Sequence, residues 1–460
     1  MIMISRNDQQ VVKEAIIAGN IDAAIASEAN LIDEILLSMK RNGVIDGLSK
    51  HIKDNRERRA IPFGMVLTLA FAAKMKLASS LTDVPYAIRS AKTLAELGYC
   101  MWDTERDLGK GLMDEGCIRA LLGKYEADEW IAGYNDYVQK HVLPTMKMEA
   151  NIHILDATKI EVNLENDKYE GSEVIKDSDG TYQRGYKLAC LRGVIGDRGV
   201  IEEIRFGGIR THDLRLSEEM VRTSPVLKPG DILMMDRGFI DRELINDLKN
   251  VRGVDVYIPL RKGMSAYDEA VKIAREQNHW LSHPNPKRKG QKIAQVENLG
   301  MFYESANPGK DVDLTGCVVW DKEKDEYYVF VTTAIGVSAR RLISTYELRP
   351  EIEEDYRQIK DLWNIEAFKS KKLPVIAFHI MAVLVGYLYF QLFASTLQGV
   401  RWAGKSLPAA LKKYNDVEPV GIIICVGQSF AVYSLLKIMQ LYASLGADVR
   451  ARLDVALALA

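Results

Sequence analysis

The sequence predicts an α/β protein in which helices cover a mixed β-sheet, with a helical region on each side of that core. Apolar residues follow a helical spacing up to about residue 149 and again after residue 337. Between these regions, strand-like runs come first and then alternate with helices, which is typical of a mixed sheet. Apolar residues make up 47% of the 460 residues and charged residues 27%. These proportions exclude a disordered, a collagen-like and a multi-span membrane protein.

The first region, residues 1–149, is expected to be helical. Apolar side chains recur at helical spacing in four stretches, which are residues 9–20, 31–40, 64–77 and 118–124. Residues 40–59 hold seven basic and three acidic side chains. Such an excess indicates either a solvated helix face or a surface that contacts phosphates.

The central region is expected to contain the sheet. Five strand-like stretches cover residues 151–162, 186–194, 200–206, 231–236 and 255–260, and helical patterns cover 216–223 and 242–250. Residues 261–311 are polar and are expected to be irregular. Residues 316–320 and 326–332 then predict a β-hairpin.

One apolar stretch, residues 375–394, has no Asp, Glu, Lys or Arg and is long enough to span a bilayer. It is the single such stretch, and it has a Lys-rich flank on one side only. A helix that is apolar all round can equally lie in a large core, and we favour that interpretation.

The cysteines indicate a reducing compartment. The five of them lie far apart and form no Cys-x-x-Cys pair, which argues against a disulfide scaffold and a zinc site. The first residues contain no apolar run of signal-peptide length, so a cytoplasmic location is expected.

The net charge of −2 argues at first against a general nucleic-acid binder, because such proteins are usually basic. The positive charge is nevertheless gathered locally, in residues 40–59, 287–292, 357–372 and 401–413. Near-neutrality of the whole chain therefore leaves room for a local surface that contacts phosphates.

Two aspartates mark the predicted strands. Asp156 shares a strand face with Ile152, Ile154 and Ile160, and a carboxylate there is unfavourable unless it is paired or binds a metal. Asp236 ends the apolar run 232–235, and ligands of open α/β sheets bind beyond the carboxyl ends of strands. The alternatives are an Asp156 held by backbone N–H groups or a lysine, and an Asp236 that caps the next helix.

A third acid, Glu353, lies on a helix that is expected to begin at Pro350. At about 100° per residue, Glu353 lies beside an apolar stripe, and Lys360 falls within about 20° of it. If the helix extends back past Pro350, Arg349 and Tyr346 share the face of Glu353. The stripe comprises Ile352, Tyr356, Ile359 and Trp363.

Glu351 and Asp355 fall further from the stripe and are expected to be solvated. The alternative for the whole segment is a surface helix with local ion pairs. Three carboxylates that converge from two sheet positions and a later helix suit hard divalent cations and two-metal phosphoryl transfer.

These residues resemble a known family, the DDE transposases of bacterial insertion sequences. The resemblance is to the subgroup with a signature of Tyr, two residues, Arg, three residues, Glu, six residues and Lys. Tyr346, Arg349, Glu353 and Lys360 match that spacing. Asp156 in Leu-Asp-Ala-Thr and Asp236 in Met-Asp-Arg-Gly-Phe match the first two acids.

The resemblance implies an RNase H-like catalytic core interrupted by a β-rich insertion. Its parts would be residues 150–260 and 336–372 for the core and 261–335 for the insertion. Residues 1–149 would then bind DNA, and residues 373–460 would serve dimerisation or DNA contact.

The resemblance also implies the site. Asp156, Asp236 and Glu353 would be catalytic and would bind two Mg²⁺ ions, for which Mn²⁺ can substitute. The DNA contacts would be Tyr346, Arg349, Lys360 and Arg237.

The implied activity is cut-and-paste transposition. Its partners would be double-stranded DNA, as transposon ends and target, and a second copy of the chain in the synaptic complex, with no membrane. The enzyme would lie in the bacterial cytoplasm and associate with the nucleoid when bound to DNA. Cleavage through a DNA hairpin would need an aromatic side chain for a flipped base. Trp280 and Trp320 are the candidates, with core packing as the alternative role of each.

Three other functions stay open. They are a metal-dependent nuclease without strand transfer, a domesticated DNA-binding protein without catalysis, and a two-carboxylate glycosidase. Arg349 and Lys360 suit phosphates better than sugars, which argues against the glycosidase.

Overall fold

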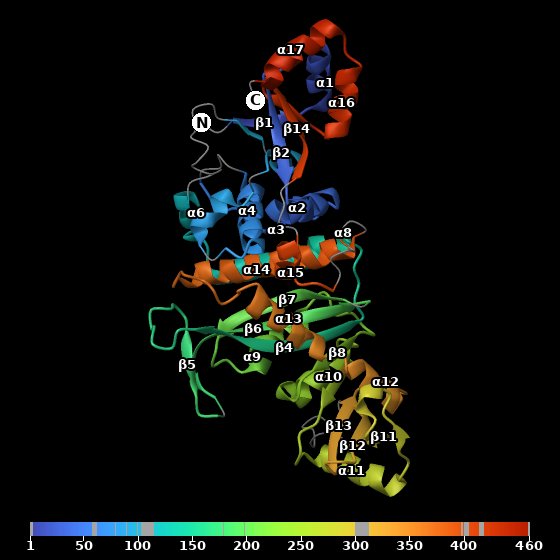
Figure 1. Cartoon of the computed structure of the whole chain (residues 1–460). Helices are drawn as coiled ribbons and strands as arrows, with labels where there is room; N and C mark the ends of the chain where they lie inside the picture. The colour runs from blue at the N-terminus through green and yellow to red at the C-terminus, as the bar shows by residue number, and fades with distance from the viewer. Residues whose placement is uncertain are drawn as a thin grey trace. The chain divides into compact units, whose positions relative to one another are not determined.

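Figure 1 shows the computed structural model of the chain, which forms two compact units. The central unit is Val138–Arg357, and the terminal unit combines Met1–Tyr137 with Gln358–Ala460. The structure describes residues 3–57, 62–78, 80–88, 90–98, 100–102, 115–177, 179–196, 198–299, 312–396, 399, 404–413 and 418–458.

A ten-stranded mixed sheet forms the centre of the central unit. Its order is β10-β11-β12-β13-β9-β8-β4-β6-β5, and β7 pairs with β6. The neighbours β4, β8 and β9 run parallel, and the other pairs are antiparallel. The strands are β4 (Ile152–Val162), β5 (Glu173–Lys176), β6 (Tyr182–Ile195), β7 (Arg198–Gly208), β8 (Ile232–Met235), β9 (Asp255–Pro259), β10 (Leu281–Ser282), β11 (Gln291–Leu299), β12 (Leu314–Asp321) and β13 (Glu326–Thr332).

Helices α9 (Asp213–Thr223), α10 (Arg242–Asn250) and α11 (Ser265–Gln277) pack against this sheet through one continuous core. Helix α10 contributes Leu244, Ile245 and Leu248, each at most 1% exposed, to that core. Helices α12 (Ala339–Tyr346) and α13 (Pro350–Arg357) follow β13. The mixed α/β class predicted from the sequence is confirmed.

The prediction of irregular structure for residues 261–311 was wrong for the part that the structure describes. Helix α11 and strands β10 and β11 lie there. The buried face of α11 is built from Ala266, Ala270 and Ala274, which are spaced four residues apart. Alanine is a weak apolar signal among charged neighbours, and the helix was missed for that reason.

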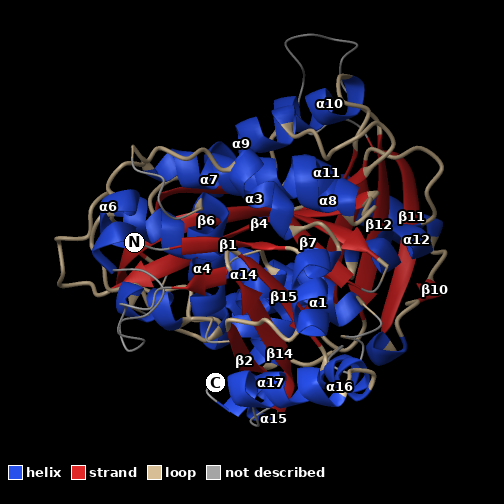
Figure 2. Ribbon diagram, turned by 90° about the horizontal axis from the view of Figure 1, so that it is seen from above, coloured by secondary structure: helices blue, strands red, loops and turns tan. Residues whose placement is uncertain are grey.

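The strands of this region continue the core sheet. Strand β13 pairs antiparallel with β9, with Val331 opposite Ile258. In Figure 2, β11 and β12 lie side by side at this end of the sheet, as their pairing requires. Hydrogen bonding between β9 and β13 therefore joins β10, β11, β12 and β13 to the strands that position Asp156 and Asp236.

A buried helix, α14 (Leu373–Ser395), forms the core of the terminal unit. It packs against α2 (Leu31–Arg41), α4 (Phe63–Met75) and α7 (Ala127–Tyr137). By length and composition it could cross a membrane, but 83% of its most apolar window is buried inside the protein. The hydroxyls of Tyr137 and Tyr389 share a 2.7 Å hydrogen bond in this core. This packing is that of the core helix expected from the sequence.

A second sheet lies in the terminal unit, where only helices were predicted. Its order is β2-β14-β15-β1-β3, so strands from both ends of the chain pair. Strand β2 reads Ala-Ala-Ile-Ala-Ser-Glu-Ala, which is rich in residues that favour a helix. The strands are β1 (Met3–Asn7), β2 (Ala23–Ala29), β3 (Cys100–Trp102), β14 (Glu418–Val426) and β15 (Ser429–Tyr433).

Helices cover both faces of this second sheet. Val12 and Ile16 of α1 (Gln9–Ala18) pack on one face together with residues of α16 (Leu435–Ala443) and α17 (Ala447–Ala458). Ala95 of α5 (Ala91–Glu96) packs on Ile423 and Phe430. Among the described residues, the other α-helices are α3 (Leu48–His51), α6 (Glu115–Leu122) and α15 (Leu407–Lys413) of the terminal unit and α8 (Leu143–Thr145) of the central unit.

A buried histidine is hydrogen-bonded near the beginning of β4. The ring of His153 is 2.8 Å from the Glu202 carboxylate and 3.3 Å from that of Asp231. Burial favours the neutral ring, but the hydrogen bonds to Asp231 and Glu202 outweigh it and raise the pKa of His153 to about 9. The imidazolium therefore joins β4 to β7 and to the residue that precedes β8.

We expect the free energy of unfolding to fall as the pH rises toward 9. The pKa of His153 is higher in the folded chain than its ordinary 6.5, so this stabilisation is complete below pH 6.5 and lost above about pH 9. This rise in the pKa of His153 corresponds to a contribution on the order of 3 kcal/mol to the free energy of unfolding. Urea unfolding between pH 6 and pH 9.5 measures it. His153→Gln should lack this part of the pH dependence, and an identical pH profile in the variant would contradict the assignment.

Candidate active site

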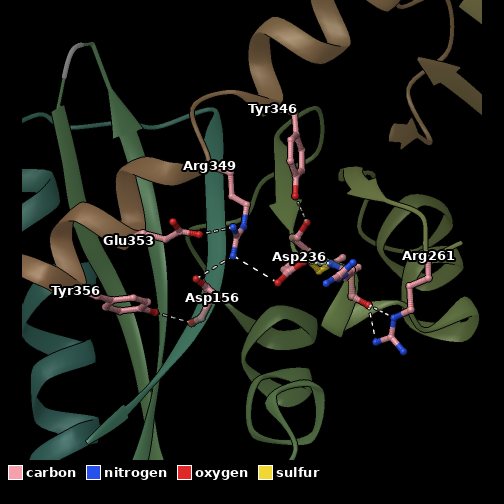
Figure 3. A network of polar contacts seen from close by, with 9 residues as sticks. Asp156, Asp236, Arg261, Tyr346, Arg349, Glu353 and Tyr356 are labelled. Atoms are coloured by element: carbon pink, nitrogen blue, oxygen red, sulfur yellow. Dashed lines mark hydrogen bonds and ion pairs between the residues drawn. The ribbon is translucent and has the colours of Figure 1, made fainter. Parts of the chain in front are cut away.

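Two parallel strands bring the two aspartates together. Leu155 of β4 lies opposite Met235 of β8, so Asp156 and Asp236 come one residue after this matched pair. Asp156, in the middle of β4, and Asp236, just after the end of β8, therefore lie close to each other, as Figure 3 shows. The carboxylate of Asp236 also accepts the Arg237 N–H at the start of a 3-10 turn. The capping role and the site position predicted for Asp236 therefore coexist.

The third acid, Glu353, comes from helix α13, which begins at Pro350 as predicted. Its side chain is 57% exposed, whereas that of Asp156 is 13% exposed. The hydroxyl of Tyr356, on the same helix, donates to the Asp156 carbonyl at 2.7 Å. Tyr356 was predicted only as part of the apolar stripe, and it also ties α13 to β4.

A single guanidinium meets all three carboxylates. Arg349 lies 2.6 Å from Glu353, 3.1 Å from Asp156 and 3.6 Å from Asp236, measured between nitrogen and oxygen atoms. Figure 3 shows its side chain between the three acids. The shared face of Arg349 and Glu353 was predicted for a helix that extends back past Pro350. Helix α13 begins at Pro350, yet the i,i+4 ion pair still brings Arg349 beside Glu353.

Charge and burial oppose each other at Asp156. Burial raises its pKa, Arg349 lowers it, and the neighbouring Asp236 and Glu353 raise it again, with a net result of about 6. The Arg349 guanidinium is therefore the cation that keeps three neighbouring carboxylates together at neutral pH.

Tyr346 packs against the same strands. Its hydroxyl donates to the Met235 carbonyl at 3.2 Å, and its ring lies 4.9 Å from that of Phe330. Burial raises the pKa of this hydroxyl above its usual value. Arg237 has an exposed side chain, and its carbonyl accepts two hydrogen bonds from Arg261. Arg261 was not predicted at the site, and it holds the turn that follows Asp236.

Lys360 lies in a π-helical turn, Gln358–Leu362, which belongs to the terminal unit. Its ammonium lies 3.6 Å from the Glu366 carboxylate. The predicted angle between Lys360 and the Glu353 face assumed about 100° per residue, and a π-helical turn has wider spacing. That angular argument was wrong beyond Arg357.

The prediction that Asp355 and Glu351 are solvated was wrong for Asp355. Asp355 is 5% exposed, and its carboxylate lies 2.5 Å from the Arg192 guanidinium. Glu351 is partly exposed and pairs with the same guanidinium at 2.9 Å. Arg192 was missed, although a lone arginine in the apolar strand run Leu188–Val194 carries the same signal that singled out Asp156.

The donor set fits a hard cation, with one rearrangement. No group of three His, Cys, Asp or Glu side chains among the described residues is close enough to hold a metal as it lies. The three carboxylates nevertheless converge on one positive group, and carboxylate oxygens are the ligands that Mg²⁺ prefers. Arg349 would have to move away before the acids could close on a metal.

The two tryptophans singled out from the sequence lie together. The rings of Trp280 and Trp320 are 5.3 Å apart and belong to a cluster with Tyr327. The indole N–H of Trp320 donates to Asp325, and both tryptophans are partly buried. The contacts account for packing of both rings.

Several of the basic side chains have acidic partners. Lys40 pairs with Asp46, Arg56 with Asp54, and Arg288 with Glu347. Arg58, Arg59 and Arg401 of the predicted basic segments lie outside the described residues. His212 caps α9, because its side chain accepts a hydrogen bond from the Leu214 backbone N–H.

We expect Arg349→Met to destabilise the folded chain at pH 8 by about 2 kcal/mol and much less at pH 4. The carboxylates repel one another when Arg349 is absent, and this raises the folded-state pKa of Asp156 further. Such a loss is present above that pKa and disappears as protonation relieves the repulsion. Urea unfolding in EDTA at both pH values measures it.

The matched control is Arg357→Met, which removes a 54% exposed arginine from α13. It should change the free energy of unfolding little at either pH. An equal loss at pH 4 and pH 8 in Arg349→Met would show that the charge of Arg349 does not balance the three acids.

A comparison with protein families gives one match. The model described as the transposase DDE domain matches residues 147–389, which is more than half of the chain. This segment contains Asp156, Asp236 and Glu353. No curated protein matches the chain.

Proposed function

The chain belongs to the family of transposases with a DDE domain, and from this premise we propose that it excises an insertion sequence and joins its ends to target DNA. Asp156, Asp236 and Glu353 are the proposed catalytic residues. The observation that carries this proposal is their convergence on one cation from β4, the end of β8 and α13.

The same three carboxylates are the proposed metal ligands. Bound there, two Mg²⁺ ions, or Mn²⁺ in their place, would activate the attacking oxygen and stabilise the leaving one. Asp156 and Asp236 are held by the strand register, and Tyr356 secures the backbone of Asp156. These contacts hold two ligands in place before substrate arrives.

Both reactions are displacements at phosphorus. In cleavage, a water oxygen bonds to the phosphorus and the bond to the 3′ oxygen breaks, leaving a 3′-hydroxyl. In joining, that hydroxyl bonds to a target phosphorus and displaces another 3′ oxygen. The charge that develops on the phosphate requires cations around it, which is the role proposed for Arg349, Lys360 and Arg237.

Arg349 is proposed to exchange carboxylates for a DNA phosphate. Its Nε–H is buried and has no hydrogen-bond partner among the described residues. A guanidinium suits a phosphate as well as a carboxylate, because both accept two parallel hydrogen bonds. Movement of Arg349 to DNA would free the three acids for metal. Tyr346 is proposed to contact the same DNA backbone.

The other parts of the chain have proposed roles that follow from the family. Residues 1–149 would bind the inverted repeats, and residues 373–460 would serve dimerisation or DNA contact in a homodimeric complex. If cleavage proceeds through a hairpin, Trp280 or Trp320 would hold the flipped base. The tryptophan that does so would have to give up its contact with the other tryptophan ring.

We expect Asp156→Asn, Asp236→Asn and Glu353→Gln each to reduce DNA cleavage to background, because each removes a negatively charged ligand. Binding to DNA that carries the element's inverted repeats should be retained, since it does not require these charges. Mg²⁺-dependent strand cleavage and gel-shift binding measure the two properties. Near-normal cleavage by any of the three variants would overturn the assignment of that residue.

The control for Glu353→Gln is Glu354→Gln, one residue later on α13, where the exposed acid pairs with Arg357. It should cleave normally. Joined products in the same assay distinguish a transposase from a nuclease that cuts without strand transfer. Binding without cleavage in Mg²⁺ and in Mn²⁺ by the unmodified chain would instead support a DNA-binding protein.

We expect Arg349→Met to bind Mn²⁺ more tightly than the unmodified chain when DNA is absent. The guanidinium competes with the metal for the three carboxylates, and Met removes the competitor. Titration calorimetry of the full chain at pH 8 measures the affinity. Weaker or unchanged Mn²⁺ binding would contradict a competition at this position.

A further inference from the structure

We infer that Arg192 is a positioning residue, whose buried guanidinium holds helix α13 in the rotation that directs Glu353 toward Asp156 and Asp236. This inference rests on the proposed function, because it assigns a consequence to the orientation of Glu353. The contacts that support it lie within the central unit.

Helix α13 needs an external support. It has eight residues, begins at a proline and gives way to a π-helical turn. Helices of this length are marginal on their own, so tertiary contacts decide how they lie. Glu353 has an exposed side chain and cannot orient the helix through its own burial.

Arg192 forms ion pairs with the side of α13 that faces away from Glu353. Glu351 and Asp355 lie two residues before and two residues after Glu353, which places each about 160° from it around the helix. The Arg192 guanidinium contacts Asp355 at 2.5 Å and Glu351 at 2.9 Å. A rotation of α13 that turned Glu353 away would break both ion pairs.

The sheet is built to accommodate this guanidinium. Arg192 lies on β6 and is 4% exposed. A Cβ atom added to Gly199 of β7 would lie 1.9 Å from the Arg192 Cζ, so the glycine leaves the space that the guanidinium fills. A buried arginine is unfavourable unless it is paired, and its two acidic partners on α13 meet that requirement.

The same two strands carry the support and the catalytic acid. Arg192 lies opposite Ile154 of β4, and Cys190, two residues earlier, lies opposite Asp156. Residues two apart on a strand share a face at about 7 Å. Arg192 and the Tyr356 hydroxyl therefore hold α13 at two points on the face that carries Asp156.

The test separates orientation from folding. Arg192→Met alone leaves Asp355 buried without its charge partner and is expected to destabilise the chain. The double variant Arg192→Met/Asp355→Leu removes both charges and should unfold near the temperature of the unmodified chain. Loss of a partner that touches a metal ligand typically weakens metal binding by about 10-fold to 100-fold. Arg192 acts on Glu353 through the helix rather than by direct contact, so we expect the lower end of that range, about 10-fold.

Two readouts follow the double variant in the full chain. Mn²⁺ binding without DNA, followed by electron paramagnetic resonance, should weaken while the unfolding temperature is retained. DNA cleavage should require a correspondingly higher Mn²⁺ concentration for half-maximal rate. Arg192→Lys keeps the charge but cannot contact both carboxylates with a planar guanidinium. Its Mn²⁺ affinity should lie between those of the double variant and the unmodified chain.

Two matched variants complete the experiment. Arg205→Met removes an arginine from β7 that pairs with Glu203, and it should leave Mn²⁺ affinity unchanged. Gly199→Ala keeps Arg192 but fills its space, and it should weaken Mn²⁺ binding in the same direction as the double variant.

A folded double variant with unchanged Mn²⁺ affinity would overturn the inference and leave Arg192 a stabilising residue only. Glu353→Gln in the same titration distinguishes this from failure of the proposed function. If Glu353→Gln weakens Mn²⁺ binding and the double variant does not, the positioning role fails alone. If Glu353→Gln also leaves the affinity unchanged, Glu353 is not a metal ligand and the proposed site fails with it.

Discussion

Mutual repulsion among three carboxylates is the constraint on which the site depends. Asp156, Asp236 and Glu353 approach one point, and burial already disfavours the charged form of Asp156. Such a cluster stays fully ionised in a folded chain only with a cation at its centre. Arg349 supplies that cation in the structure, and metal ions are proposed to replace it during catalysis. The same requirement explains why an arginine four residues before Glu353 lies among the acids rather than in solvent.

Buried charge recurs along the strands that carry the site. His153, three residues before Asp156 on β4, lies between two carboxylates. Arg192, on the neighbouring strand β6, pairs with two carboxylates of α13. Each set joins elements that are far apart in the sequence. A buried ion pair contributes little net stability compared with well-packed apolar side chains, but it tolerates few alternative arrangements. These sets therefore serve mainly to place β4, β8 and α13 relative to one another.

The central sheet links the site to the region between β9 and α12. Trp280 directly precedes β10, and Trp320 lies on β12. Because β13 pairs with β9, these strands belong to the same sheet as β4 and β8, which position Asp156 and Asp236. This continuity fixes the position of the proposed hairpin-assisting residues relative to the two aspartates that are proposed to be catalytic. In the terminal unit, the buried helix α14 and a sheet built from both ends of the chain form the core.

The sequence alone determined those features that depend on neighbours along the chain. The strand that contains Asp156, the end of the strand before Asp236, the helix start at Pro350 and the closeness of Arg349 to Glu353 all follow from local spacing. Tertiary structure alone decided the pairing of β1 and β2 with β14 and β15, the burial of Asp355 by Arg192 and the encounter of Arg349 with Asp156. Asp355 lies 163 residues from Arg192, and Arg349 lies 193 residues from Asp156. Local periodicity carries no information about such partners, because the energy of each contact arises only when the chain has folded.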